Sequence, residues 1–368
     1  MRAFAWQALA LALVAGAAAW LWGNVTGNLA RRNLGIDFGF LGSRASFEFG
    51  ENLVGYRGGD TFLRAFQAGL ANTVLVAVAG IALTTVAAVA LALMRLSPNR
   101  LARNLAWAWI ELVRNTPLLL QLLFWHQVTI RQLPGPRQAW EVLPDVFLSN
   151  RGLYLPAILA QPAFGQAAVA LLIGAGLALA LARLLPEGRR GLAWLALAAP
   201  PLLVLALLAD PVEVTRPALR GFNFQGGVSL SPEFVALVVA LTVYQAGFMA
   251  ETIRSGILGV ASGQAEAAAA LGLRRGQALR LVVFPQALRI VIPPVTSQYL
   301  SLTKNSSLAV VIGYPDLVRV SQVTISETGR AVECISILLL VYLSLSLGTA
   351  ALMGLYNRRV MARGGGAR

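Results

Sequence analysis

The sequence predicts an all-α, polytopic membrane protein with about eight transmembrane helices, and two observations lead to this class. Apolar residues make up 57% of the 368 positions and charged residues only 12%, whereas soluble domains contain about 45–50% and about 25%. The apolar residues also gather in uncharged runs close to the length of about 20 residues that a helix needs to cross a bilayer. Together these observations exclude a cytosolic enzyme, a disordered protein and a small secreted protein.

Eight runs are long and apolar enough to be spanning helices. The first directly follows Met1 and Arg2 and is longer than the apolar core of a signal peptide, so we expect a retained anchor. The fifth is interrupted by Pro200 and Pro201. The eight runs cover residues 4–23, 67–94, 107–125, 165–182, 191–209, 234–253, 286–312 and 332–354.

The arginines predict the orientation of the chain. Cytoplasmic loops of membrane proteins are enriched in Arg and Lys, which accounts for the net charge of +14 without nucleic acid. Four segments are rich in arginine, and their acids are only Glu187 and Glu266, whereas 24–66 and 210–233 mix both signs. We therefore expect both termini to be cytoplasmic, together with segments 95–106, 183–190, 254–285 and 355–368.

A metal or haem site is not expected, because the chain holds one cysteine, Cys334, and one histidine, His126. Neither residue type has the second copy that such sites usually require. We expect His126, which lies beside Trp125, to be a residue of the membrane interface.

The cytoplasmic stretch 262–273 is rich in alanine and predicts a short surface helix. Ser262 suits the N-cap, Glu266 is expected in the first turn, and Gly272 suits the left-handed position after the helix. The small residues would let a partner approach closely. From spacing alone, an ordinary amphipathic connector is an equally good interpretation.

The residues after this helix add a resemblance to a known family. Glu266-Ala267-Ala268, Gly272 and the apolar group that ends at Pro285 resemble the EAA loop of ABC importer permeases. Val282-Val283-Phe284-Pro285 departs mildly from the usual Ile-x-Leu-Pro. The resemblance implies a type I ABC importer permease fold and a coupling helix that docks into a separate ATPase subunit, through Gln264, Glu266, Ala267, Ala268, Gly272 and Pro285.

Three further stretches, 111–121, 285–289 and 304–309, resemble those of polar amino-acid permeases. The stretch 150–156, together with the two spans at 165–209, resembles the longer permease subunits of general L-amino acid ABC transporters, and the resemblance covers residues of about 60–368. The resemblance implies an unlike second permease subunit, cytoplasmic ATPases that hold ATP and Mg, and a periplasmic amino-acid-binding protein that meets 126–164 and 210–233. It also implies the inner membrane of a bacterium, and it leaves open which amino acids are carried.

The chain itself has no nucleotide-binding loop, because such a loop needs a lysine in a glycine-rich context. The single lysine, Lys304, follows Thr303 in an apolar segment. The chain is therefore not expected to be an enzyme, and no cofactor is expected in it.

A polar stripe in the run 286–312 is the candidate substrate path. Gln298, Ser301 and Asn305 share one helical face, and polar groups in lipid usually face protein or a water-filled path. Lys304 could attract a substrate carboxylate or pair with an acid, and packing between helices is the alternative for the whole stripe. We expect Pro293-Pro294 to kink or break this helix. The candidate path residues are Gln298, Ser301, Lys304, Asn305, Ser306 and Ser307.

Two pairs of opposite charge lie near predicted span ends, Glu111 with Arg114 and Glu251 with Arg254. Each pair has the i, i+3 spacing of neighbours on a helix, and we favour an ion pair that braces the gate region over a direct role with substrate. Gln245 lies on the span of Glu251 and could line the path or pack. The structural and gate candidates are Glu111, Arg114, Thr116, Pro117, Gln121, Glu251 and Arg254.

The expected domains are a membrane anchor with an outer loop at 1–66, a permease domain at 67–358 with an insertion at about 126–232, and a cytoplasmic tail at 359–368. An ion-coupled secondary amino-acid transporter is the alternative function. Such a protein would carry coupling acids in mid-span, whereas Glu111, Glu251 and Glu333 lie towards span ends. A membrane-embedded enzyme is less favoured still, because a catalytic set deep in the bilayer is missing.

Overall fold

The computed structural model describes residues 2–31, 35–50, 54–158 and 214–362, together with 177, 199–200 and 202–203. The chain divides into two compact units. The first comprises Met1–Trp125 and Ala236–Arg368, and the second comprises His126–Val235. The second unit covers almost the same residues as the expected insertion. Most of the predicted spans 165–182 and 191–209 lies outside the described residues.

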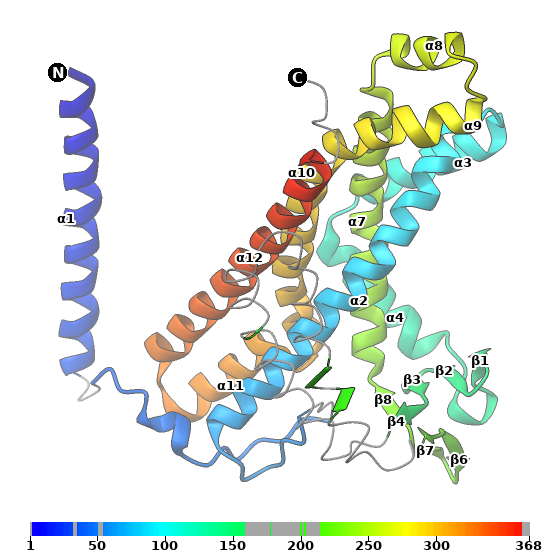
Figure 1. The fold of residues 1–368 in the computed structure, drawn as a ribbon. Helices are drawn as coiled ribbons and strands as arrows, with labels where there is room; N and C mark the ends of the chain where they lie inside the picture. The colour runs from blue at the N-terminus through cyan, green and yellow to red at the C-terminus, as the bar shows by residue number, and fades with distance from the viewer. Residues whose placement is uncertain are drawn as a thin grey trace. The chain divides into compact units, whose positions relative to one another are not determined.

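The first unit is helical (Figure 1). It begins with α1 (Arg2–Arg31), and a short 3-10 turn, η1 (Gly39–Gly42), precedes α2 (Phe62–Leu96). After these come α3 (Arg100–Arg114), α4 (Leu118–Arg131), α7 (Pro232–Leu258), α8 (Ser262–Ala270), α9 (Arg275–Ala278), the π-helical turn η4 (Leu279–Val283), α10 (Phe284–Asn305), the 3-10 turn η5 (Ser306–Ile312), α11 (Leu317–Thr328) and α12 (Ala331–Ala362).

Five helical stretches within the described residues are long and apolar enough to cross a membrane, and they match five of the eight predicted runs. The predicted span 107–125 is divided, because α3 ends at Arg114 and α4 begins at Leu118, and the interruption lies where Thr116-Pro117 predicts a helix irregularity. Pro117 explains the interruption, since proline lacks a backbone donor and disfavours helical geometry at Thr116. The five stretches are Leu9–Asn28, Phe62–Leu96, Pro232–Leu258, Gly276–Ile312 and Ala331–Asn357.

Small residues let the long helices of the first unit approach closely. Ala88 and Ala92 of α2 are fully buried, and they pack in one cluster with Ala246 and Ala250 of α7 and with Val291 of α10. Alanine at helix contacts in membranes allows the backbones to come near each other. This packing holds α2, α7 and α10 together at the end of the unit that leads to α8.

Residues 35–50 and 54–61, which we call the N-terminal loop, pack against the start of α2 and against α11 and α12. Phe40 and Tyr56 of this loop are buried in a cluster with Phe62 of α2, Leu317 of α11 and Cys334 of α12. Tyr56 also donates a hydrogen bond to the carbonyl oxygen of Phe47. Burial raises the pKa of the Tyr56 hydroxyl to about 12, with smaller contributions from nearby carboxylates. The loop is therefore part of the folded core of this unit.

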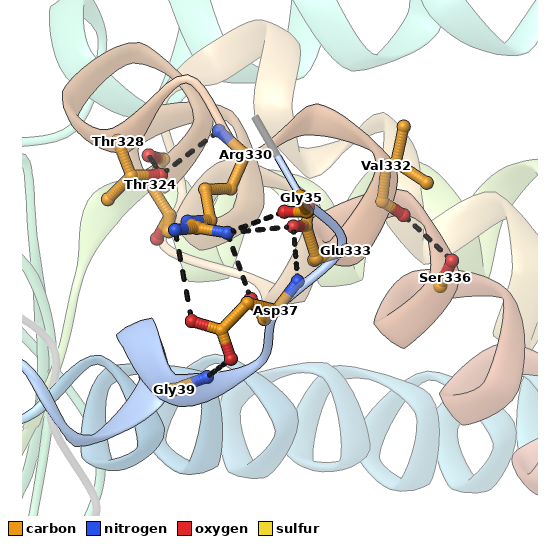
Figure 2. Close-up of polar contacts among 9 residues, drawn as sticks. All are labelled: Gly35, Asp37, Gly39, Thr324, Thr328, Arg330, Val332, Glu333 and Ser336. Carbon is orange, nitrogen blue, oxygen red and sulfur yellow. Dashed lines mark hydrogen bonds and ion pairs between the residues drawn. The ribbon is translucent and has the colours of Figure 1, made fainter. Parts of the chain in front are cut away.

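Arg330, in the turn between α11 and α12, fastens the N-terminal loop (Figure 2). Its guanidinium donates to the carbonyl oxygens of Gly35 at 3.1 Å and Asp37 at 3.2 Å, and to the Glu333 carboxylate at 3.1 Å. The backbone N–H of Asp37 donates to the same Glu333 oxygen at 3.1 Å. We call Arg330, Glu333 and Asp37 the Arg330 cluster.

The second unit contains a small antiparallel sheet that the sequence analysis did not predict. The all-α class is confirmed for the chain as a whole, but the strands of the second unit are too short for their alternation to stand out. The sheet has the order β1 (Trp140–Leu143), β2 (Val146–Ser149), β3 (Gly152–Leu155) and β8 (Val228–Leu230). Two further pairs join β4 (Ala157–Ile158) to β5 (Val214–Thr215) and β6 (Ala218–Arg220) to β7 (Asn223–Gln225), and the 3-10 turn η2 (Pro136–Gln138) precedes the sheet.

Candidate functional site

The predicted coupling segment forms α8, which lies between α7 and α9 at one end of the first unit (Figure 1). The prediction for Gly272 is confirmed, because its φ of 79° is left-handed. The N–H groups of Gly272 and Leu273 return to the carbonyl oxygens of Ala269 and Ala268 at 2.9 and 3.1 Å. This pair of bonds is the Schellman motif that ends many helices.

The beginning of α8 differs from the prediction. Ser262 is the first helical residue, so it is not the N-cap, and Ala261 takes that position without a side-chain bond. Glu266 consequently lies beyond the first turn. The helix therefore begins without a side-chain cap, and its end at Gly272 is the better-defined boundary.

The two faces of α8 have different surroundings. The inward face borders a groove of about 400 Å³ that α9 and η4 complete, and it consists of Ala265, Ala268 and Ala269. The outward face is exposed, and it consists of Gly263, Glu266, Ala267 and Ala270. Of the candidate coupling residues, Gln264, Glu266, Ala267 and Gly272 are exposed, while Ala268 is only 3% exposed and packs inward.

A hydrogen bond connects α8 to α10. The Gln286 side-chain amide donates to the Gln264 side-chain oxygen at 3.0 Å. Pro285 lies in the first turn of α10, directly after the π-helical turn η4. Gln264 and Pro285 thus belong to the connection between α8 and the long helix that follows.

Helix α10 carries the candidate path residues. The expected break is wrong, because α10 continues through Pro293 and Pro294. Ser301 and Lys304 are exposed, and so is Ser297, which lies one turn before Ser301 on the same face. Sequence reasoning missed Ser297, although its i, i+4 spacing to Ser301 was a usable signal.

The other candidate path residues are less exposed. The Gln245 side chain on α7 contacts the Gln298 side-chain oxygen and donates to its backbone oxygen at 3.3 Å. The hydroxyl groups of Ser306 and Ser307 donate to backbone oxygens one turn earlier, at 2.8 and 2.7 Å. Asn305 ends α10 and is half-buried. Within the described ranges, Lys304 makes no ion pair with an acid.

A cavity of about 830 Å³ lies among α2, α7, α10 and α12 of the first unit. Its lining is almost wholly apolar, and the opposite face of α10 contributes Val291, Val295 and Tyr299. The candidate path residues do not line it. The exposed polar stripe of α10 and this cavity are therefore separate features.

The stretch 111–121 builds the turn between α3 and α4. The hydroxyl of Thr116 donates to the carbonyl oxygen of Leu112 at 2.8 Å, and the buried Gln121 amide donates to Val113 at 2.8 Å and to Thr116 at 3.1 Å. These bonds satisfy backbone oxygens where the helix is interrupted. The carboxylate of Glu111 lies 3.9 Å from the guanidinium of Arg114, in a pair that is about 40% exposed.

The pair at Glu251 has a third member. Glu251 accepts from Arg254 at 2.7 Å, as the spacing predicts, and its other oxygen accepts from Arg95 at 3.1 Å. Arg95 belongs to the last turn of α2 and was not among the predicted site residues. The one signal for Arg95 in the sequence was its position at the start of the predicted cytoplasmic segment 95–106. We call Arg95, Glu251 and Arg254 the Glu251 cluster.

Asp316 is a buried acid that sequence reasoning missed. It is the N-cap of α11, and its carboxylate accepts from the N–H of Arg319 at 2.8 Å. Burial raises the pKa of Asp316 to about 7, against the opposing effect of hydrogen bonds from the α11 backbone. The neighbouring Asn72 side chain donates to the carbonyl oxygen of Pro315 at 2.9 Å. These bonds fix the start of α11 against α2.

Long apolar helices define the class of the protein, a membrane-spanning protein. The chain belongs to the family of inner membrane components of binding-protein-dependent transport systems, whose family model matches residues 80–362. This membership gives no support to the ion-coupled alternative.

Three curated relatives match over nearly their whole lengths. The putative amino-acid ABC transporter permease protein YhdX of Escherichia coli (strain K12) is 42% identical, over 98% of this chain and 94% of the relative. The general L-amino acid transport system permease protein AapQ of Rhizobium johnstonii is 40% identical, over 98% and 92%. The glutamate/glutamine/aspartate/asparagine transport system permease protein BztB of Rhodobacter capsulatus is 34% identical, over 98% and 93%.

Proposed function

We propose that this chain is the permease subunit of an ATP-driven importer of L-amino acids in a bacterial inner membrane. The observation that carries the proposal is the similarity along the full chain to three permeases, all of which are named for amino-acid transport. A second, unlike permease subunit and a periplasmic amino-acid-binding protein complete the transporter on this proposal.

Energy enters through α8. The chain has no nucleotide-binding loop, so ATP and Mg belong to cytoplasmic ATPase subunits. The outward face of α8 supports a docking role, because its small residues around Glu266 permit a close approach. The bond between Gln264 and Gln286 supports transmission of the motion from α8 to α10. The arginine distribution supports a cytoplasmic position for α8 and for both termini.

The substrate path follows the exposed stripe of α10. Ser297, Ser301 and Lys304 offer hydroxyl and ammonium groups to the carboxylate and ammonium of an amino acid. An open stripe on one subunit needs a second wall, and the unlike permease subunit supplies it on this proposal. The contact between Gln298 and Gln245 supports a role for these two residues in holding α10 against α7.

The experiment is ATP-dependent uptake of a labelled L-amino acid panel by vesicles that contain the whole complex. Glu266→Lys reverses the charge on the outward face of α8, and we expect uptake to fall at least tenfold while the subunit still inserts. Glu48→Lys is the matched control, because it reverses an exposed acid in the N-terminal loop and leaves α8 intact.

Each of three outcomes would contradict a different part of the proposal. Unchanged uptake by the Glu266→Lys complex would contradict the role of α8. An active complex that takes up no amino acid would contradict the substrate class. Gradient-driven uptake without the ATPase subunits would contradict ATP coupling.

A further inference from the structure

The tip of the hairpin β6–β7 in the second unit exposes a phenylalanine. Phe222 is 74% exposed, more than most large apolar side chains of the described residues. It lies in a two-residue turn between Arg220 and Asn223, which face each other across the hairpin. Gly221, the first turn residue, has a φ of 67°, while Phe222 has no positive φ. This combination is typical of a type II′ turn, which fits the twist of a hairpin.

Arginines surround Phe222. The guanidinium of Arg137 lies 4.9 Å from the centre of the Phe222 ring, in a cation–π contact. Arg151 donates to the carbonyl oxygen of Phe222 at 3.1 Å, and Arg220 is exposed on the adjoining strand. We call Arg137, Arg151, Arg220 and Phe222 the arginine–phenylalanine patch.

The charges of this patch are not neutralised within the described part of the second unit. Arg137, Arg151 and Arg220 are all exposed and form no ion pair with a described acid. Arg216, two residues before the same hairpin, differs because its guanidinium pairs with Asp145 at 3.3 Å. The patch therefore offers three guanidinium groups around one apolar ring.

The stretch 150–156, which the family resemblance singled out, forms the base of the patch. Tyr154 is 2% exposed and donates to the side-chain oxygen of Asn223 at 2.6 Å. Phe224 lies against Phe147 and Tyr154, with ring centres 4.7 Å apart in both pairs. Gly152 has a φ of 122°, and a Cβ there would collide with the carbonyl oxygen of Leu230. The strand that supplies Arg151 is thus held firmly under the hairpin.

We propose that the arginine–phenylalanine patch is a docking surface for an acidic face of the soluble amino-acid-binding protein. This inference rests on the proposed function, which requires such a protein, and adds the residues and the charge of the contact. Arginine and aromatic residues dominate the binding energy of protein interfaces, and a guanidinium can hold a carboxylate through two hydrogen bonds. The fixed hairpin reduces the entropy lost on docking.

The test uses the complete transporter in lipid nanodiscs and the binding protein of the same transport system, loaded with the amino acid that gives the strongest uptake. Stimulation of ATP hydrolysis is measured against binding-protein concentration. We expect Phe222→Ala to raise the half-maximal concentration at least tenfold. The double variant Arg137→Gln/Arg151→Gln should do the same and should lose most of the salt dependence of the wild type.

Arg216→Gln is the control. It removes an arginine of the same unit, but this arginine is already paired with Asp145. We expect it to stay within twofold of the wild type. ATP hydrolysis without the binding protein should be unchanged in all variants, since the patch is remote in the chain from α8. Phe222 is exposed, so its removal should not unfold the hairpin, and the arginine variants test the same surface with the ring retained.

Two results would overturn the inference alone. One is a half-maximal concentration within twofold of the wild type for both patch variants, with stimulation intact. The other is that the patch variants lose binding to phosphatidylglycerol vesicles while their affinity for the binding protein is unchanged. That result would mean that the patch binds lipid phosphate. A wild-type complex that no binding protein stimulates would instead contradict the proposed function.

Discussion

The Arg330 cluster and the Glu251 cluster lie at opposite ends of α2 and are built alike. Each contains a glutamate and an arginine three residues apart, and each recruits a partner from a distant part of the chain. Glu333 and Arg330 fasten Asp37 near the start of α2, whereas Glu251 and Arg254 reach Arg95 in its last turn.

The two clusters differ in charge balance and in burial. The Arg330 cluster has two acids for one arginine, and the Glu333 side chain is only 4% exposed. The Glu251 cluster has two arginines for one acid, and its side chains are 16–29% exposed. A third pair of the same spacing, Glu111 with Arg114, is about 40% exposed. Equal spacing along the chain therefore leads to three environments, and burial should rank the energies of the three pairs.

The largest effect is expected at the most buried pair. Arg330→Ala removes the cation from a nearly buried carboxylate and the donor from two carbonyl oxygens, which should cost about 2–4 kcal/mol of folding stability. The apparent Tm of the purified subunit in detergent, with a dye that reports on Cys334, measures it. Cys334 is buried beside Glu333 and should become reactive as this end of the unit opens.

Arg330→Lys is the matched control, because it keeps a charge but cannot form the same fork of hydrogen bonds. It should lie between the wild type and Arg330→Ala. An unchanged Tm and unchanged Cys334 reactivity in Arg330→Ala would show that the N-terminal loop is held by its apolar residues alone.

An intermediate effect is expected at the Glu251 cluster. Glu251→Gln removes the only acid between two arginines, and the loss of charged hydrogen bonds should cost about 1–2 kcal/mol. Because the cluster connects α2 to α7 next to the α8 connection, uptake should fall by more than the loss of folded protein explains. The measurement is uptake per folded transporter, with Arg95→Gln as the partner variant.

Arg95→Gln keeps the pair of Glu251 with Arg254 and should lose less stability than Glu251→Gln. If uptake per folded transporter stays at the wild-type value in both variants, the cluster only stabilises the fold. In that case the Glu251 cluster and the Arg330 cluster would differ only in how much folding stability each contributes.

The sequence predicted local pairs well and distant partners poorly. The spacing of Glu251 and Arg254 on one helical face gave a contact that the structure confirms, but Arg95 lies over 150 residues away and follows no local rule. Gly272 was predicted because a left-handed residue after a helix has few alternatives. Ser262 was misplaced because a helix boundary shifts easily by one residue.

The spans were predicted from local sequence, whereas the second unit depends on contacts between distant residues. Long apolar runs identify helices because the bilayer requires internally bonded backbone, so α2, α7, α10 and α12 were predictable. The strands of the second unit have two to four residues each, and their pairing depends on contacts such as Gly152 with Leu230. Of the kink or break expected at Pro293 and Pro294, the break is wrong, because α10 continues through both prolines.

The smallest effect is expected at Glu111 and Arg114. Their pair is exposed and 3.9 Å long, so Glu111→Gln should change folding stability by less than about 1 kcal/mol. The introduced amide would keep an oxygen that can accept from the Asn115 side chain, which donates to Glu111 at 3.2 Å. The apparent Tm measures the effect, in the same detergent as Arg330→Ala. A loss as large as that of Arg330→Ala would break the ranking by burial.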